Sequence, residues 1–287
     1  MARGKPVTIR SIEANRGDIN EFADELEKIA RSFSRLVQKE IIRALGENQD
    51  SILAADAAPD IRKTGVNADA NKTDELLTRI LEMQKKNFLG KYNTRISRLV
   101  SKYVQKTHRS VNNAQQSAFK AAGIDLHDQR GIDDLGKANP AATKNKARHA
   151  VTLSENVHKF LSSQMNKLKL IAVGTVTTGG SLADLKERYR EKDSVGTICQ
   201  QIAENTGHFM TAEIQQENAA ILGCEQGIWV HRPGAWSSRK THRAMDGRKF
   251  DLSKGMWDPE VQLYVQPGQL PNCRCTFRMI FPFEKDK

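Results

Sequence analysis

The chain has 287 residues, of which 38% are hydrophobic, 28% charged and 6% aromatic. This length is enough to bury a core and suggests about two domains, and the charged content favours amphipathic helices over a large buried sheet. No run of about eighteen apolar residues occurs, so no membrane span is expected. The basic N-terminus lacks the hydrophobic segment of a secretory signal.

Lysine and arginine outnumber the acidic residues, leaving a formal net charge of +11. Such a surplus favours polyanionic partners, of which nucleic acid is the first candidate. The four cysteines are too few for a disulfide scaffold of this size, which indicates free or metal-bound thiols in a reducing compartment.

Residues 1–17 form a basic arm with Gly4, Pro6 and Gly17, expected to be poorly ordered unless a partner holds it. An extended helical region is predicted over residues 18–123. Its first helix begins at Asp18, because apolar residues then recur at steps of three and four. Residues 47–72, rich in Asn, Asp and Ala, are predicted to be a linker with one short helix.

The segment from Thr73 to Gly123 is predicted to form one very long helix, or two joined near Gly90. It contains no Asp or Glu between Met83 and Ile124. One interpretation of its basic row is a solvated face, or one that meets acidic patches of neighbouring subunits. The other is contact with DNA phosphates, which would be electrostatic, salt-sensitive and independent of base sequence. The residues of this row are Lys85, Lys86, Lys91, Arg95, Arg98, Lys102, Lys106 and Arg109.

Glycines and an Asn-Pro pair mark residues 124–146 as a second linker. A further helical region is predicted over residues 147–222 and ends at Gly223. From 223 to 287 the composition favours a small module of short strands, with a closing strand over 275–281. The predicted fold class is therefore α+β and predominantly helical: long N-terminal helices followed by a small C-terminal α+β module with short antiparallel strands.

Within this module, Cys273 and Cys275 are two residues apart, so an extended backbone projects both thiols from one face. With His231 and His242 they make a Cys2His2 set suited to tetrahedral zinc, although the spacing is not that of a zinc finger. Without a metal, the cysteines would be small buried residues on either side of an exposed Arg274.

Three further interpretations concern His242. It can hydrogen-bond the Asp246-Gly247 turn and organise the fold. It can act as the base for a cysteine nucleophile. With His231 and Asp246 it can form a metal-dependent nuclease centre.

A Trp-containing strand, an Arg-x-x-His-x-x-x-Asp-Gly segment and a closing Pro-Asn-Cys-Arg-Cys follow one another here. In this order the region from Ile198 to Phe283 resembles the C-terminal domain of the phage Mu protein F-like minor head proteins, the phage head morphogenesis family. Family members often carry Ala-Arg-Thr-Glu on the preceding helix, where this chain has Ala203-Glu204-Asn205-Thr206. The residues expected to organise the fold, or to form a site, are His231, Arg239, His242, Asp246, Gly247, Asn272, Cys273, Arg274 and Cys275.

The resemblance implies a minor capsid protein of a tailed double-stranded DNA phage that acts in head morphogenesis. The implied partners are portal and capsid proteins and, through the basic row, double-stranded DNA. The implied location is the virion, at the interior of the head and portal vertex, and the host cytoplasm during assembly. No enzymatic activity, small-molecule substrate or cofactor is expected. The alternatives are zinc at the Cys2His2 set and a metal-dependent nuclease or hydrolase centred on the His/Asp/Cys cluster.

Overall fold

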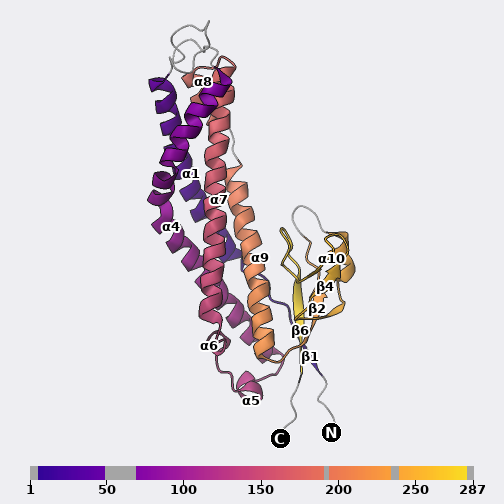
Figure 1. The fold of residues 1–287 in the computed structure, drawn as a ribbon. Coiled ribbons are helices and arrows are strands. Elements are labelled where there is room, and N and C mark those ends of the chain that lie inside the picture. The colour runs from indigo at the N-terminus through magenta and orange to yellow at the C-terminus, as the bar shows by residue number, and fades with distance from the viewer. Residues whose placement is uncertain (1–5, 49–68, 191–193, 234–238, 283–287) are drawn as a thin grey trace. The chain divides into compact units, whose positions relative to one another are not determined.

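The computed structural model describes residues 6–48, 69–190, 194–233 and 239–282 (Figure 1). The predicted fold class is confirmed, because long helices precede a small module of short antiparallel strands. Among the described helices, none has the length and apolarity needed to cross a bilayer. The helices are α1 (Arg16–Glu47), α4 (Ala70–Ala121), α5 (Leu126–Arg130), α6 (Leu135–Ala138), α7 (Ala142–Thr177), α8 (Leu182–Arg188), α9 (Val195–Ile221) and α10 (Lys240–Met245). The strands are β1 (Val7–Ile9), β2 (Gln226–Val230), β3 (Lys249–Asp251), β4 (Met256–Asp258), β5 (Leu263–Val265) and β6 (Thr276–Phe281).

The chain divides into two compact units, and their boundary falls within the long helices. Unit 1 comprises Met1–Phe22, Ser101–Thr152 and Gln200–Lys287. Unit 2 comprises Ala23–Val100 and Leu153–Cys199. The C-terminal module predicted over 223–287 therefore shares its compact unit with residues 1–22, 101–152 and 200–222.

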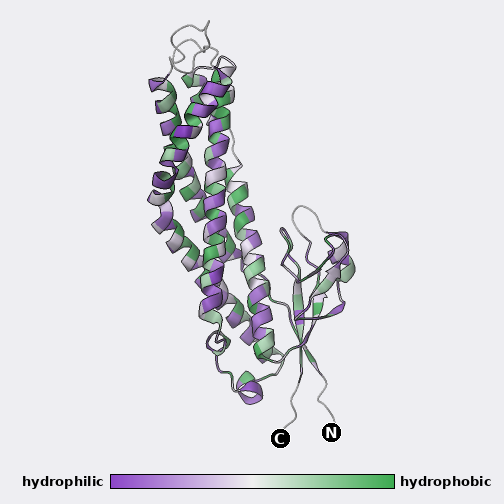
Figure 2. Ribbon diagram, in the orientation of Figure 1, coloured by the Kyte–Doolittle hydropathy of each residue, from purple (hydrophilic) through white to green (hydrophobic). Residues whose placement is uncertain are grey.

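Unit 2 is entirely helical in its described part. Hydrophobic and hydrophilic residues alternate along its long helices (Figure 2), which is the pattern of helices that bury one face. On α1 the buried face includes Leu26 and Phe33, as the spacing of three and four residues predicts. The ring of Phe33 meets that of Tyr92 edge-on, with centroids 5.8 Å apart. The α4 helix runs through Gly90 without a break, so the single-helix alternative is the correct one.

Unit 1 packs a four-stranded antiparallel sheet, in the order β1-β6-β2-β3, against helix ends. Trp229 on β2 and Phe277 on β6 lie in one apolar core with Ala219 of α9 and with Leu222, which directly follows that helix. Phe119 of α4 contacts Phe281 of β6 edge-on at 5.4 Å between ring centroids. The sheet therefore holds both strands that lead to the cysteine and histidine residues.

The N-terminal arm differs from the prediction. Val7–Ile9 forms β1 and pairs antiparallel with β6, with Val7 opposite Phe281. The β-branched side chains of Val7, Thr8 and Ile9 favour a strand. Its partner, β6, lies at the other end of the chain, so the local sequence pattern of the arm gives no sign of the pairing. The tertiary structure thus turns part of a predicted loose arm into a sheet edge.

Two other predicted irregular segments also contain regular structure. The linker predicted over 124–146 holds α5, α6 and the start of α7, and Asp125 and Asp134 cap the two short helices. The segment from Trp257 to Tyr264, whose composition predicts an irregular excursion, belongs to a two-stranded hairpin, β4–β5. Of the linker predicted over 47–72, residues 49–68 lie outside the described residues, as does its predicted short helix.

Candidate metal centre

The turn that follows Pro271 brings the two cysteines towards α10. Asn272 adopts a left-handed conformation with φ 59°, which asparagine tolerates better than most residues. Its backbone N–H donates to Oδ1 of Asn205 on α9, at 2.8 Å. Cys273 follows this turn, and Cys275 directly precedes β6. The turn therefore fixes the start of the cysteine segment to a helix.

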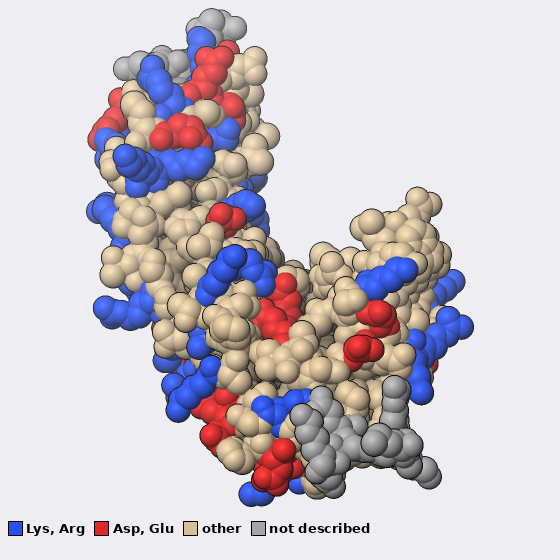
Figure 3. All heavy atoms as spheres, turned by 60° about the horizontal axis from the view of Figure 1, so that its bottom comes forward, with Lys and Arg blue, Asp and Glu red and all other residues tan. Residues whose placement is uncertain are grey.

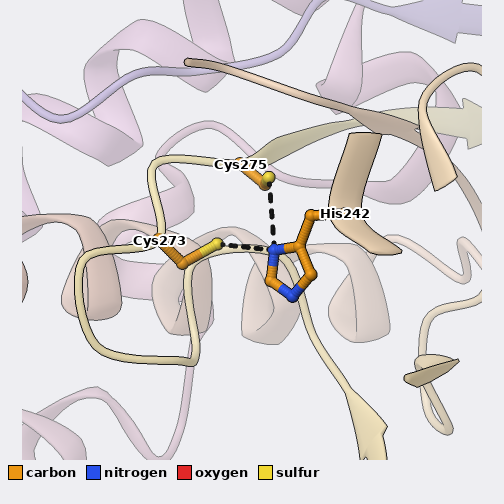
Figure 4. A group of neighbouring side chains, drawn as sticks. All are labelled: His242, Cys273 and Cys275. Atoms are coloured by element: carbon orange, nitrogen blue, oxygen red, sulfur yellow. Dashed lines mark hydrogen bonds between the residues drawn. The ribbon is translucent and has the colours of Figure 1, made fainter. Parts of the chain in front are cut away.

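His242 lies on α10 and points its imidazole at both thiols (Figure 4). Its Nδ1 is 3.3 Å from Sγ of Cys273 and 3.6 Å from Sγ of Cys275. The three ligand atoms all lie within 4.8 Å of one another. The side chains are between 2% and 5% exposed. This buried group could hold a metal ion.

His231, which follows β2, lies next to the group. Its Nδ1 is 3.5 Å from Sγ of Cys275, and its backbone N–H donates to Oδ1 of Asp246 at 2.8 Å. The fold thus places near one another all four residues of the Cys2His2 set. Three of them form the buried group, and His231 is half-buried at its edge.

The environment divides the two cysteines into a proton acceptor and a proton donor. A hydrogen bond donated by Cys275 lowers the pKa of Cys273, and the neighbouring His242 adds to the effect. The same hydrogen bond, together with burial, raises the pKa of Cys275. A thiolate is the form of cysteine that ligates metals and reacts as a nucleophile.

Asp258 on β4 lies on the other side of the imidazole and is fully buried. Its Oδ2 is 3.2 Å from Nε2 of His242. The predicted hydrogen bond between His242 and the Asp246 turn is therefore not the observed arrangement. Asp258 was not among the predicted site residues, because nothing in its local sequence marks it and the residues that separate it from His242 carry no spacing signal.

The other predicted residues hold turns. Arg239 donates from Nη2 to the carbonyl of Pro271, at 3.1 Å. Gly247 takes φ 73°, and its N–H donates to the carbonyl of Trp229. The Trp229 ring is buried and meets the imidazole of His242 edge-on, with centroids 5.3 Å apart. These contacts connect α10, the cysteine segment and β2.

Arg274 was predicted to be exposed between the cysteines, but it is half-buried and forms an ion pair with Glu204 on α9. Glu204 and Asn205 stand where the phage family often has Arg and Thr. In this chain they bind Arg274 and the backbone of Asn272. These contacts connect α9 to the cysteine segment.

The basic row on α4 divides into paired and unpaired side chains. Lys102 and Lys106 both contact Glu21 of α1, whose pKa these two lysines lower to about 2. Lys85 lies 3.2 Å from Glu82. Figure 3 shows blue basic side chains interspersed with red acidic ones on the face it draws. The predicted residues that are exposed, with no carboxylate of the described chain within ion-pair distance, are Lys86, Lys91, Arg95, Arg98 and Arg109.

Comparison of the chain with protein-family models, with curated proteins and with solved structures gives no match.

Proposed function

We propose that this chain is a minor head protein of a tailed double-stranded DNA phage, and that its C-terminal module is a non-enzymatic docking unit. The resemblance of the region from Ile198 to Phe283 to the phage head morphogenesis family supports this. The observation that carries the proposal is the burial of His242, Cys273 and Cys275 in one group. A catalytic group must reach a substrate, whereas a group that organises a fold is best placed inside it.

We further propose that the buried group holds a structural zinc ion. Thiolate and imidazole ligands suit zinc, and structural zinc sites are closed and tetrahedral. Zn–S and Zn–N bonds of about 2.3 and 2.1 Å give a sulfur-to-nitrogen edge of about 3.6 Å in a tetrahedron. The measured edges are 3.3 and 3.6 Å to His242 and 3.5 Å to His231. Cys273, Cys275 and His242 would supply three ligands. His231 lies close to Cys275 alone and would have to approach the other two side chains to supply the fourth.

Metal analysis of the purified chain tests the zinc proposal. We expect about one zinc per chain in the wild type and a loss of zinc when Cys273 and Cys275 are both replaced by serine. Cys224→Ala is the matched control, because Cys224 is also buried but lies outside the group. A wild type without stoichiometric metal, or a double variant that retains it, would sink the proposal.

Co-expression with the portal protein of the same phage tests the assembly role. We expect the chain to co-elute with the portal oligomer, and the double cysteine variant to lose this association because its docking unit no longer folds. If the wild type never co-elutes with the portal, the assembly role is wrong. A His242→Ala variant that stays folded but loses a nuclease activity of the wild type would instead support the enzyme alternative.

We propose that contact with DNA is made by the exposed part of the basic row. Unpaired guanidinium and ammonium groups can each neutralise a phosphate. Lys102 and Lys106 already neutralise Glu21, so their charge is less available to DNA. The proposed contacts are those in unit 2: Lys86, Lys91, Arg95 and Arg98.

A further inference from the structure

One face of the β4–β5 hairpin is buried at Asp258 and Val265, although Leu263 at its end is exposed, and the other face is turned to solvent. Asp258 and Val265 are 0% and 1% exposed. Trp257 and Tyr264 lie opposite each other in the register and are 51% and 47% exposed. Successive residues of a strand point to opposite faces. The step from Trp257 to Asp258 therefore takes the chain from solvent to the buried imidazole.

Asp258 is an unusual residue to find fully buried, since an ionised carboxylate inside a protein is costly unless it is paired and hydrogen-bonded. Its Oδ1 accepts from the backbone N–H of Glu260 at 2.9 Å. Its Oδ2 lies 3.2 Å from Nε2 of His242, off the line of a hydrogen bond. Within the described residues, Oδ2 of Asp258 and Nε2 of His242 have no hydrogen-bond partner.

The placement of Asp258 bears on the tautomer of His242. A proton on Nε2 would lie on the side of Asp258, 3.2 Å from Oδ2 but not aligned with it, and the lone pair of Nδ1 would then be directed at the two sulfurs. That is the form in which an imidazole ligates a metal through Nδ1. A ligating histidine commonly donates its other N–H to a carboxylate, which fixes the tautomer and the ring orientation.

We propose that Asp258 positions His242 for metal binding, and that the metal in return holds the β4–β5 hairpin in place. This inference rests on the metal centre proposed above. The carboxylate keeps Nδ1 free of a proton, and a cation on Nδ1 draws the Nε2–H towards Oδ2 and completes its hydrogen bond. Loss of the cation would loosen the buried side of the hairpin, and with it the surface on the other side.

That surface carries an ordered aromatic pair. The rings of Trp257 and Tyr264 meet edge-on at 5.4 Å between centroids, and Nζ of Lys254 lies 4.4 Å from the centre of the Tyr264 ring. Metal occupancy would therefore govern whether this pair is presented in a fixed arrangement.

The affinity of Asp258→Asn for metal tests the positioning role. Co2+ is titrated into the metal-free chain, followed by displacement with Zn2+. We expect Asp258→Asn to bind about 10- to 100-fold more weakly than the wild type. Glu260→Gln is the matched control, because this exposed carboxylate lies two residues away on the same hairpin, and we expect its affinity to be unchanged. Equal affinities for wild type and Asp258→Asn would overturn the role of Asp258. A wild type that binds neither metal would overturn the metal centre itself.

Two measurements on the wild type do not depend on the folding of a variant. Nitrogen-15 NMR of the Zn2+-bound chain should show His242 protonated at Nε2 and ligated through Nδ1, and ligation through Nε2 would overturn the proposal. Hydrogen exchange across Met256–Val265 should slow when Zn2+ is added. Exchange that does not respond to bound Zn2+ would refute the coupling to the hairpin.

Discussion

Two buried histidines of unit 1, His108 on α4 and His149 on α7, are in direct contact. Their Nε2 and Nδ1 atoms lie 3.0 Å apart, and Nε2 of His149 lies 2.6 Å from Oε2 of Glu213 on α9. Arg148 also binds Glu213. Burial, and next the charge of His149, lower the pKa of His108 to about 3. His108 is therefore neutral at pH values where an exposed histidine is largely protonated.

This depressed pKa predicts a pH-dependent stability. Below pH 6.5 the unfolded chain takes up a proton at His108 that the folded chain refuses until about pH 3. Stability from this residue is therefore complete above pH 6.5 and is lost as the pH falls, by up to about 1.4 kcal/mol per pH unit. Urea unfolding should show that His108→Gln reduces the difference in the free energy of unfolding between pH 5 and pH 7. The exposed His127→Gln is the control, and an equal effect of both substitutions would contradict the prediction.

The shortest strands contribute to stability through single buried side chains. In β1, Ile9 is buried in the core of unit 1, whereas Thr8 beside it is exposed. Ile9→Ala removes buried apolar contacts and should lower the free energy of unfolding by about 2–5 kcal/mol. Thr8→Ala should change it by less than about 0.5 kcal/mol. Urea denaturation measures both, and equal effects would show that β1 is not a stable part of the sheet.

Because the whole chain carries a formal net charge of +11, any charge reversal can weaken DNA binding. A test of the α4 row therefore needs a control variant with the same change of net charge. Reversing Lys91, Arg95 and Arg98 to Glu should weaken binding to duplex DNA and reduce the slope of log affinity against log salt by about 0.9 per lost phosphate contact. Fluorescence anisotropy at several salt concentrations measures this.

The control reverses the same number of charges on α1, at Lys28, Arg35 and Lys39, which are not part of the α4 row. We expect this variant to lose less affinity. Equal losses in the two variants would mean that net charge alone governs binding, and that the α4 row is not a DNA contact.

The sequence by itself determined the long helices and the fold class, with short antiparallel strands after them. Apolar residues such as Leu26 and Phe33 recur at helical spacing, and that signal is carried by contiguous residues. The sequence also indicated that Cys273 and Cys275 share a face and that His242 and His231 belong with them. A spacing of two residues restricts two thiols directly, through local backbone geometry alone.

Only the tertiary structure decided what lies against these elements. Glu21 neutralises Lys102 from 81 residues away, and Glu204 binds Arg274 from 70 residues away. Asp258 reaches the imidazole of His242 from a hairpin that the sequence presented as an irregular excursion. Such contacts depend on how distant segments pack together, and this packing produces no periodic pattern in the sequence of either segment. The pairing of the two cysteines was therefore local information, and the environment of the site residues was not.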